Sequence, residues 1–208
     1  MPLIRSIKNA EISLGLWEIT EASSFFEEAS PYRAVASHPG QQLQQLASRM
    51  VLKALQPLFP FEQIQLNPAG KPFLSEGMPQ FSISHTRGFA AGIISNETPV
   101  GIDIEWISPR VLKIEKKFLN PHEHALLASL SEQDRIVFAS LFWSIKETVY
   151  KCWGNGGVDF SEDIRIQSFS LQDQGTAAIQ FGQSAAVHDV HYFREGDLWL
   201  SYMHAFLQ

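Results

Sequence analysis

The stretch Val100–Trp106 constrains the fold of this chain more than any other segment. It reads VGIDIEW, so that large apolar residues occupy every second position. Because successive side chains of a strand point to opposite faces, the large apolar residues share one face. Asp103 and Glu105 share the other face with Gly101. The pattern predicts a strand that packs one face into a core and carries two carboxylates on the other.

These two carboxylates are spaced to converge on one cation. Residues two apart in a strand have Cα atoms roughly 6.5–7 Å apart, and adjacent anions repel each other unless positive charge lies between them. Carboxylate oxygens, together with water and a substrate phosphate, are the ligands that Mg²⁺ prefers. The alternative is a strand whose second face is solvated and binds nothing. An Asp-x-Glu pair is too short to decide between the two.

Charge and cysteine content exclude several classes of protein. The formal net charge of −6 over 208 residues argues against a nucleic-acid binder that relies on overall basicity. Cys152 is the single cysteine, which excludes an internal disulfide and a multi-cysteine metal site. No apolar run approaches the roughly 18 residues of a membrane span, and residues 1–10 lack the apolar region of a signal peptide. We therefore expect a cytoplasmic protein that binds neither nucleic acid nor membrane.

The order of periodic segments predicts an α+β fold in which helices lie beside antiparallel sheets. Residues 41–56 have apolar positions at helical spacing, and Ser131 opens a capping-box pattern before a long helix to about Lys151. Each half of the chain offers both kinds of element, and the division falls near Asp103. Further helical segments are expected at residues 21–36, 109–118 and 121–129, a meander of antiparallel strands at 81–84, 89–95 and 100–106, and other strands at 12–20, 164–169, 176–181, 187–193 and 198–206.

The long helix supplies further candidates for the same site. Glu147 and Lys151 are four residues apart, so they lie on one stripe of the helix together with Trp143, and Lys146 lies beside that stripe. Glu147 is a candidate third metal ligand, and Lys151 is placed one turn further on to meet a phosphate. The alternative is an ordinary Glu–Lys pair on a solvated face.

Three blocks of sequence, taken together and in this order, resemble the motifs of the 4′-phosphopantetheinyl transferases. The resemblance is to the larger, surfactin-synthetase-activating type in particular. The blocks are Gly-Lys-Pro at residues 70–72 followed by Phe-Ser-Ile-Ser-His at 81–85, Val-Gly-Ile-Asp-Ile-Glu at 100–105, and Phe-Trp-Ser-Ile-Lys-Glu at 142–147 followed by Tyr-Lys at 150–151.

The resemblance implies a fold and a reaction. It implies two similar lobes related by a pseudo-two-fold axis, an N-terminal lobe at residues 1–100 and a C-terminal lobe at 101–208, with coenzyme A bound between them. The implied activity is the Mg²⁺-dependent transfer of the 4′-phosphopantetheine arm of coenzyme A to a serine of an apo acyl or peptidyl carrier protein, with release of 3′,5′-adenosine bisphosphate. Two lobes in one chain favour a monomer.

The resemblance also assigns roles to residues. Metal ligation falls to Asp103, Glu105 and Glu147, and catalysis to Glu147 as base and Lys151 as the cation at the leaving group. The resemblance implies that His85 contacts the 3′-phosphate of the cofactor. The family usually adds several cations of the N-terminal lobe, whereas here that region is thin in them, with Arg33, Arg49 and Lys53, so the further residues at that end stay open. Contacts to coenzyme A are implied for Lys71, Ser84, His85, Asp103, Lys146 and Lys151.

The protein partner and two other functions remain open. Carrier proteins of the kind this family uses are acidic around their serine, so a cationic patch favours docking. The cations Arg110, Lys113, Lys116 and Lys117 follow the carboxylate strand and form a candidate patch, the alternative being a solvated surface. The same carboxylates would also serve a metal-dependent phosphohydrolase, and a member without activity would bind carrier protein or coenzyme A and transfer nothing.

Overall fold

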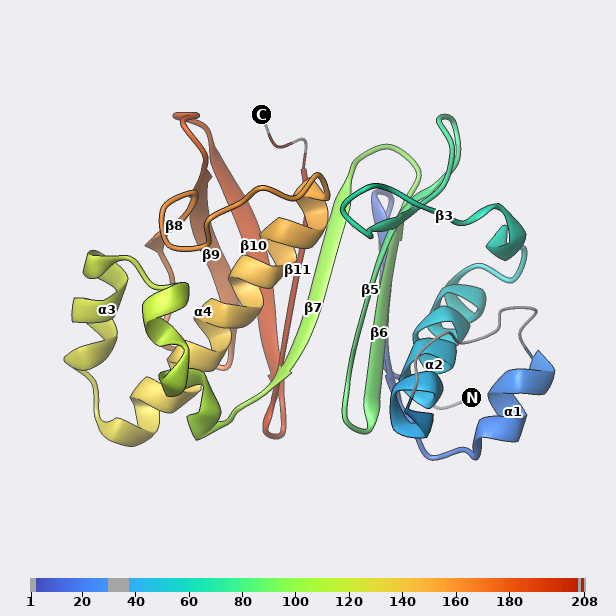
Figure 1. Cartoon of the computed structure of the whole chain (residues 1–208), viewed down its shortest axis with the longest axis horizontal. Helices are drawn as coiled ribbons and strands as arrows, with labels where there is room; N and C mark the ends of the chain where they lie inside the picture. Colours follow the sequence, from blue (N-terminus) through green and yellow to red (C-terminus); the bar gives the residue numbers. More distant parts are fainter. Residues whose placement is uncertain (1–2, 30–37, 206, 208) are drawn as a thin grey trace.

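The computed structural model describes residues 3–29, 38–205 and 207. Its two larger antiparallel sheets lie side by side, each covered by helices on its outer face (Figure 1). The N-terminal lobe, as we use the term, comprises the elements before residue 96, and the C-terminal lobe those from residue 100 onward. The elements are β1 (Leu3–Lys8), β2 (Ile12–Glu18), α1 (Ser23–Ala29), α2 (Pro39–Leu55), η1 (Phe61–Gln63), β3 (Gln65–Leu66), β4 (Pro72–Phe73), β5 (Gln80–Thr86), β6 (Phe89–Ser95), β7 (Val100–Trp106), η2 (Pro109–Lys113), η3 (Glu115–Lys117), α3 (Pro121–Ala128), α4 (Glu132–Trp153), β8 (Ile164–Ser168), β9 (Gln174–Phe181), β10 (Val187–Glu195) and β11 (Leu198–His204).

The sheet of the N-terminal lobe has the strand order β1-β2-β6-β5. Helix α2 buries its apolar stripe, which includes Leu46, Val51 and Leu52, against one face of this sheet. Pro39 lies in the first turn of α2, where its missing N–H leaves no hydrogen bond unmade. A small hairpin, β3–β4, extends from this lobe toward the C-terminal lobe.

The sheet of the C-terminal lobe has the order β7-β11-β10-β9-β8, with helix α4 lying across it. Ser131 caps α4 by accepting a hydrogen bond from the backbone N–H of Asp134, and Gly154 ends the helix in the left-handed conformation with φ of 74°. The apolar face of α4, with Phe142 and Ile145 fully buried, forms the core of the lobe. Both ends of the helix are therefore specified by local sequence.

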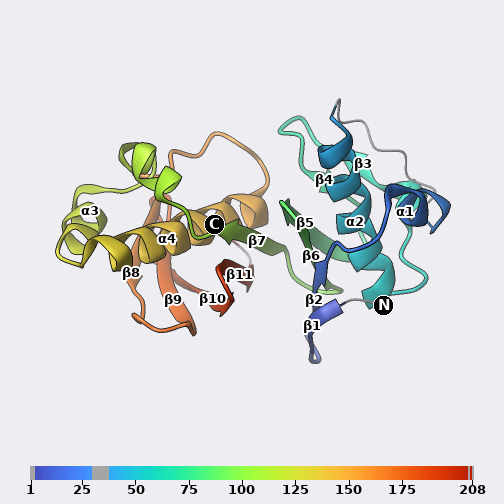
Figure 2. The same ribbon diagram turned by 90° about the horizontal axis from the view of Figure 1, so that it is seen from below.

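The structure corrects the meander expected for β5, β6 and β7. Strands β5 and β6 pair as expected, whereas β7 leaves this sheet and pairs with β11. Figure 2 shows β7 alongside β5 where the two sheets meet, and there the backbone N–H groups of Ile102 and Ile104 donate to the hydroxyls of Ser82 and Ser84, each at 3.3 Å. Side chains thus replace backbone pairing at this junction.

A third core lies between the two sheets. Apolar residues of β7 and β11 pack there with those of β2 and β6, and Ile102, Leu14 and Ile93 are fully buried members of this core. The expected alternation of Val100–Trp106 is therefore confirmed, because its apolar face is buried against the N-terminal lobe. Its carboxylate face is left to meet α4.

The α+β class is confirmed, as are the long helix and the closing strands. Residues 109–118 form short 3₁₀ helices in place of a regular α-helix. The helix expected at residues 21–36 is observed as α1, and residues 30–36 of that prediction, with Arg33, lie outside the described residues. Strand β1 was not expected. No helix within the described ranges has the length and hydrophobicity that crossing a membrane requires.

Candidate active site

Strand β7 and helix α4 approach closely enough to bring their polar residues together. Gly101 makes this possible, because a Cβ at that position would overlap the carbonyl oxygen of Thr148 on α4. Asp103 and Glu105 follow on the same face of β7, and Glu147 and Lys151 extend toward them from α4. The predicted convergence of strand and helix residues is therefore observed.

Asp103 lies at the centre of this group and is 2% exposed. Its Oδ1 accepts hydrogen bonds from Lys151 Nζ at 2.6 Å and from the Ser84 hydroxyl at 3.0 Å, and Lys151 Nζ also donates to Ser84 Oγ at 3.0 Å. Its Oδ2 is buried and, in the described part of the chain, has no hydrogen-bond partner. A buried carboxylate oxygen without a partner is costly, so Asp103 has an open acceptor that a ligand would satisfy.

The two glutamates have strongly raised pKa values. Burial, followed by the negative charge of Asp103, raises the pKa of Glu147 to about 7, and Lys151 opposes the shift. Burial and Asp103 likewise raise the pKa of Glu105 to about 7, although Trp143 Nε1 donates a hydrogen bond to Glu105 Oε1 at 3.1 Å. Burial is the largest cause of both shifts, and the negative charge of Asp103 adds to each.

The donors present fit a hard divalent cation in their chemistry. All are carboxylate oxygens, one of them buried and unpaired, and an added positive charge would relieve the repulsion that raises both pKa values. The part of the chain that is described nevertheless contains no group of three Asp, Glu, His or Cys side chains already arranged to hold a metal. Lys151 supplies the positive charge on Asp103 instead.

His85 and Lys71 lie on the N-terminal side of this group. His85 is exposed at the end of β5, and its pKa is lowered by partial desolvation and by the positive charges of Lys151 and Arg49, so both cations act on this ring. Lys71 donates to the carbonyl oxygen of Cys152 at the end of α4, at 3.2 Å, and burial lowers its pKa. Its ammonium group therefore caps a helix.

A cavity of about 200 Å³ lies beside Lys71 and Lys151. Its walls come from both lobes and are mostly apolar. The N-terminal lobe contributes Phe81 and Ile83 of β5, and α4 contributes Tyr150. A cavity with this lining suits a flat, mostly apolar group that carries its charge toward the lysine side.

The structure corrects the role expected for Lys146. Its side chain is fully buried on the opposite side of α4, where Nζ donates to Glu123 Oε2 at 2.7 Å and to the carbonyl oxygens of Phe160 and Ile164. Successive residues of a helix are rotated by about 100°, so Lys146 points away from its neighbour Glu147. It holds the C-terminal lobe together and does not reach the carboxylate group.

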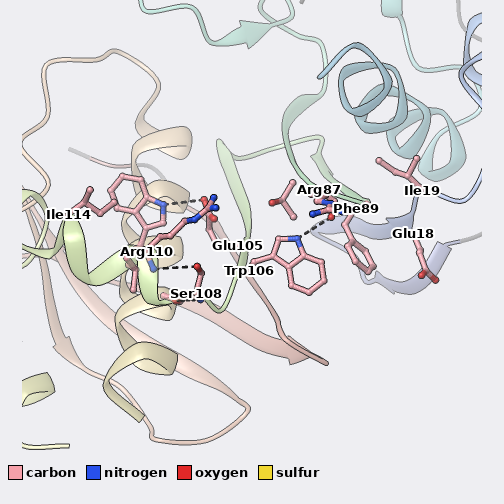
Figure 3. Close-up of a pocket in the computed structure, with 14 residues that line it drawn as sticks. Glu18, Ile19, Arg87, Phe89, Glu105, Trp106, Ser108, Arg110 and Ile114 are labelled. Carbon is pink, nitrogen blue, oxygen red and sulfur yellow. Dashed lines mark hydrogen bonds between the residues drawn. The ribbon is translucent and has the colours of Figure 1, made fainter. Parts of the chain in front are cut away.

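A larger groove of about 980 Å³ opens on the other side of Glu105. Figure 3 shows Trp106 pointing toward Phe89 and Arg87 of the N-terminal lobe, with Arg110 near Glu105. Trp106 Nε1 donates to the carbonyl oxygen of Arg87 at 3.0 Å, and its ring meets Phe89 edge to face. The groove is thus lined by aromatic side chains and by charges of both signs, with Arg87 and Arg110 beside Glu18 and Glu105.

Part of this groove was expected from the sequence. Arg110 belonged to the expected cationic patch, and Lys113, Lys116 and Lys117 are exposed on η2 and η3 beyond it. Arg87 was missed because it lies in the turn between β5 and β6, and the only signal for it was its place two residues after His85.

Comparison with known proteins adds a family. The model of the 4′-phosphopantetheinyl transferase superfamily matches residues 99–204. Among curated relatives, the chain is 34% identical over 118 residues to 4′-phosphopantetheinyl transferase gsp of Aneurinibacillus migulanus, covering 57% of this chain and 47% of that protein. It is 36% identical over 126 residues to psf-1 of Bacillus pumilus (58% and 52%) and 29% identical over 119 residues to Sfp of Bacillus subtilis strain 168 (55% and 50%). The chain thus spans about half the length of these relatives.

Proposed function

This chain belongs to the 4′-phosphopantetheinyl transferase superfamily, and we propose that it transfers the 4′-phosphopantetheine arm of coenzyme A to a serine of an apo acyl or peptidyl carrier protein. One observation carries the proposal. The group formed by Asp103, Glu105, Glu147 and Lys151 lies at the junction of the lobes, with an apolar cavity on one side and a groove that contains Arg87 and Arg110 on the other. A reaction between a nucleotide cofactor and a protein acceptor needs two such approaches to one charged centre.

In the proposed reaction, the serine oxygen attacks the phosphorus next to the pantetheine arm. The bond from that phosphorus to the bridging oxygen breaks, and 3′,5′-adenosine bisphosphate leaves. The serine proton passes to Glu147, directly or through a water. The pKa of this carboxyl is about 7 in the metal-free protein, and a bound cation would lower it, so that Glu147 would be ionised and able to accept a proton near neutral pH. Lys151 stabilises the negative charge that collects on the leaving phosphate.

We propose that Mg²⁺ is held by Asp103, Glu105 and Glu147. The unpaired Oδ2 of Asp103 and the raised pKa values of both glutamates support this set. A bound Mg²⁺ would neutralise the diphosphate of the cofactor. Lys151 would then be free to exchange its contact with Asp103 for one with phosphate.

The adenosine end of coenzyme A is proposed to occupy the cavity beside Lys71 and Tyr150. His85 would donate to the 3′-phosphate, and the nearby cations Lys151 and Arg49 support an anion at this position. Ser84 would orient Asp103 and Lys151, because its hydroxyl already bonds to both. Lys71 would form one wall of the cavity.

We propose that the carrier protein enters the groove between Arg87 and Arg110. Its acidic surface would meet these arginines and the lysines of η2 and η3, whereas the rest of this chain is negatively charged overall. The larger type of enzyme, with two lobes in one chain at residues 1–100 and 101–208 and a monomeric state, is also part of the proposal. The core that the two sheets share supports it.

Intact-mass analysis of an apo carrier protein, incubated with this protein, Mg²⁺ and coenzyme A, tests the function. A carrier heavier by one phosphopantetheine group, with an equal amount of adenosine bisphosphate, is the expected result. Release of the nucleotide without added mass would point to a phosphohydrolase instead. Binding of coenzyme A with neither product would point to a member without activity.

A further inference from the structure

The turn that carries the Gly-Lys-Pro motif is attached to the opposite lobe by its first residue. Asn67 Nδ2 donates to the carbonyl oxygen of Gly154 at 2.6 Å, although the two residues are 87 positions apart. Asn67 Oδ1 accepts the backbone N–H of Lys71 at 2.8 Å, so each end of the amide has its own partner. One side chain therefore shapes the turn and ties it to α4.

The atoms that receive this attachment are carbonyl groups at the C-terminal end of α4 and of its C-cap residue, Gly154. Helix carbonyls at a C-terminus lack partners in the helix and carry partial negative charge. The backbone N–H of Gly154 donates to the carbonyl oxygen of Tyr150, and Lys71 Nζ donates to that of Cys152 at 3.2 Å. The side chain of Asn67 donates to the carbonyl oxygen of Gly154. The N-terminal lobe thus supplies two of the donors that finish a helix of the C-terminal lobe.

Close packing at Gly154 makes this contact specific. A Cβ at position 154 would overlap Cδ of Lys71, so the lysine stem lies directly on the glycine. Lys71, Gly154 and the turn at residues 69–70 also line the cavity beside Tyr150. The contact therefore fixes the distance between two walls that come from different lobes.

We propose that Asn67 is a positioning residue that clamps the turn at residues 67–71 onto the end of α4 and holds both walls of the cofactor cavity at binding distance before coenzyme A arrives. The identity of the ligand rests on the proposed function. A wall that is already in place costs the ligand no ordering on binding, so the clamp contributes to affinity. Once coenzyme A fills the cavity the walls are held by the ligand, so the clamp contributes little to the chemical step.

Asn67→Asp removes the cross-lobe donor and keeps the acceptor that shapes the turn. We expect the Kd for coenzyme A, measured by titration calorimetry, to rise about 3- to 10-fold, the effect of losing one neutral hydrogen bond. The kcat for transfer at saturating coenzyme A should stay within about twofold of wild type, which a general loss of structure would not produce. The matched control is Asn96→Asp, the same change at an exposed residue that does not line the cavity, which should leave both values unchanged.

A second pair of variants tests the contact without touching Asn67. Gly154 and Gly157 both have positive φ, at 74° and 68°, so alanine strains the backbone at either position. Only at position 154 would the new Cβ meet Lys71, since nothing lies within 4 Å of a Cβ at 157. Gly154→Ala should therefore weaken coenzyme A binding more than Gly157→Ala does.

Hydrogen exchange in the absence of ligand separates this inference from the proposed function. Asn67→Asp should speed exchange of the amides at residues 67–73 and at 150–154 relative to Asn96→Asp, whether or not the protein binds coenzyme A. If the wild-type protein binds no coenzyme A, the proposed function is refuted. The clamp is then tested by the exchange rates alone, because they are measured without ligand. Unchanged exchange in Asn67→Asp, an unchanged Kd, or a lower kcat with an unchanged Kd would each overturn the inference.

Discussion

Neighbouring residues of α4 lie on different faces of the helix and have different roles, because each side chain is rotated away from the one before it. Glu147 and Lys151 face β7, where Lys151 bonds to Asp103, while Lys146 is buried on the other side against Glu123. Helical spacing predicted the first pair correctly. The sequence does not show that a lysine beside them belongs to the core, because its partner Glu123 is 23 residues away. That glutamate also belongs to the capping box of α3, in which it is the N3 partner of Asn120.

Lys146→Met tests this corrected role. The change leaves Glu123 buried without its cation, so the free energy of unfolding should fall by about 3–5 kcal/mol, the usual cost of breaking a buried ion pair. Urea denaturation measures it. Adding Glu123→Gln should recover part of the loss, and the folded fraction should bind coenzyme A as wild type does. A Lys146→Met variant that is stable but does not bind coenzyme A would contradict the structural role and indicate that Lys146 contacts the cofactor.

The raised pKa values of Glu105 and Glu147 predict a pH dependence of stability. The folded protein holds these protons up to a pKa of about 7, above the ordinary value of 4.5. The stability that the folded protein gains by holding these protons is therefore complete below pH 4.5 and is lost as the pH rises through 7. In metal-free buffer, wild type should lose stability from pH 5 to pH 8 relative to Glu147→Gln, and Mg²⁺ should restore more of it in wild type.

Urea midpoints at both pH values, with and without Mg²⁺, check the prediction. Glu76→Gln, at an exposed loop position, is the control for loss of one charge and should follow wild type. Parallel pH curves for wild type and Glu147→Gln would show that the carboxylates do not share a strained environment.

At the scale of elements, the spacing of apolar residues and the capping motifs predicted most helices and strands. They did not predict which distant strands pair. Local residues, Ser131 and Gly154, determine where α4 begins and ends. Local residues do not determine the partner of β7, because an alternating strand fits equally well beside β6 or beside β11, almost 100 residues later. Strand β1 was missed since its short alternation is half exposed. Local pattern predicts an element, whereas the packing of a whole lobe decides its neighbour.

Gly101→Ala tests the contact between β7 and α4. The added methyl would overlap the Thr148 carbonyl oxygen, a backbone atom that cannot rotate away. We expect a loss of about 1–3 kcal/mol in unfolding free energy, typical of overpacking, and a fall in transfer rate of at least tenfold as the carboxylates separate from α4.

Gly40→Ala is the matched control for that change. Gly40 lies in the first turn of α2, and nothing is within 4 Å of a Cβ there. Alanine favours a helix over glycine, so this variant should be as stable and as active as wild type. Equal behaviour of both variants would mean that close approach at Gly101 is unimportant.

At the scale of the whole molecule, the candidate site exists only where the two lobes meet. β5 contributes Ser84 and His85, β7 the carboxylates, and α4 the base and the cation, and the hydroxyl bridges from β5 to β7 hold the sheets in register. The motifs named most of these residues from sequence. They did not reveal the groove at Arg87 or the clamp at Asn67, because both depend on contacts between lobes that no local pattern contains.

The central claim is that Glu147 acts both as metal ligand and as base, while Lys151 serves the leaving group. The most direct test is single-turnover transfer to an apo carrier protein against Mg²⁺ concentration, for wild type, Glu147→Gln and Lys151→Ala. Glu147→Gln should lower the rate at saturating Mg²⁺ by about 100-fold or more and raise the Mg²⁺ requirement, while coenzyme A binding persists. Lys151→Ala should lower the rate with a smaller change in the Mg²⁺ requirement. Wild-type turnover in Glu147→Gln, or a larger shift in the Mg²⁺ requirement for Lys151→Ala than for Glu147→Gln, would contradict the claim.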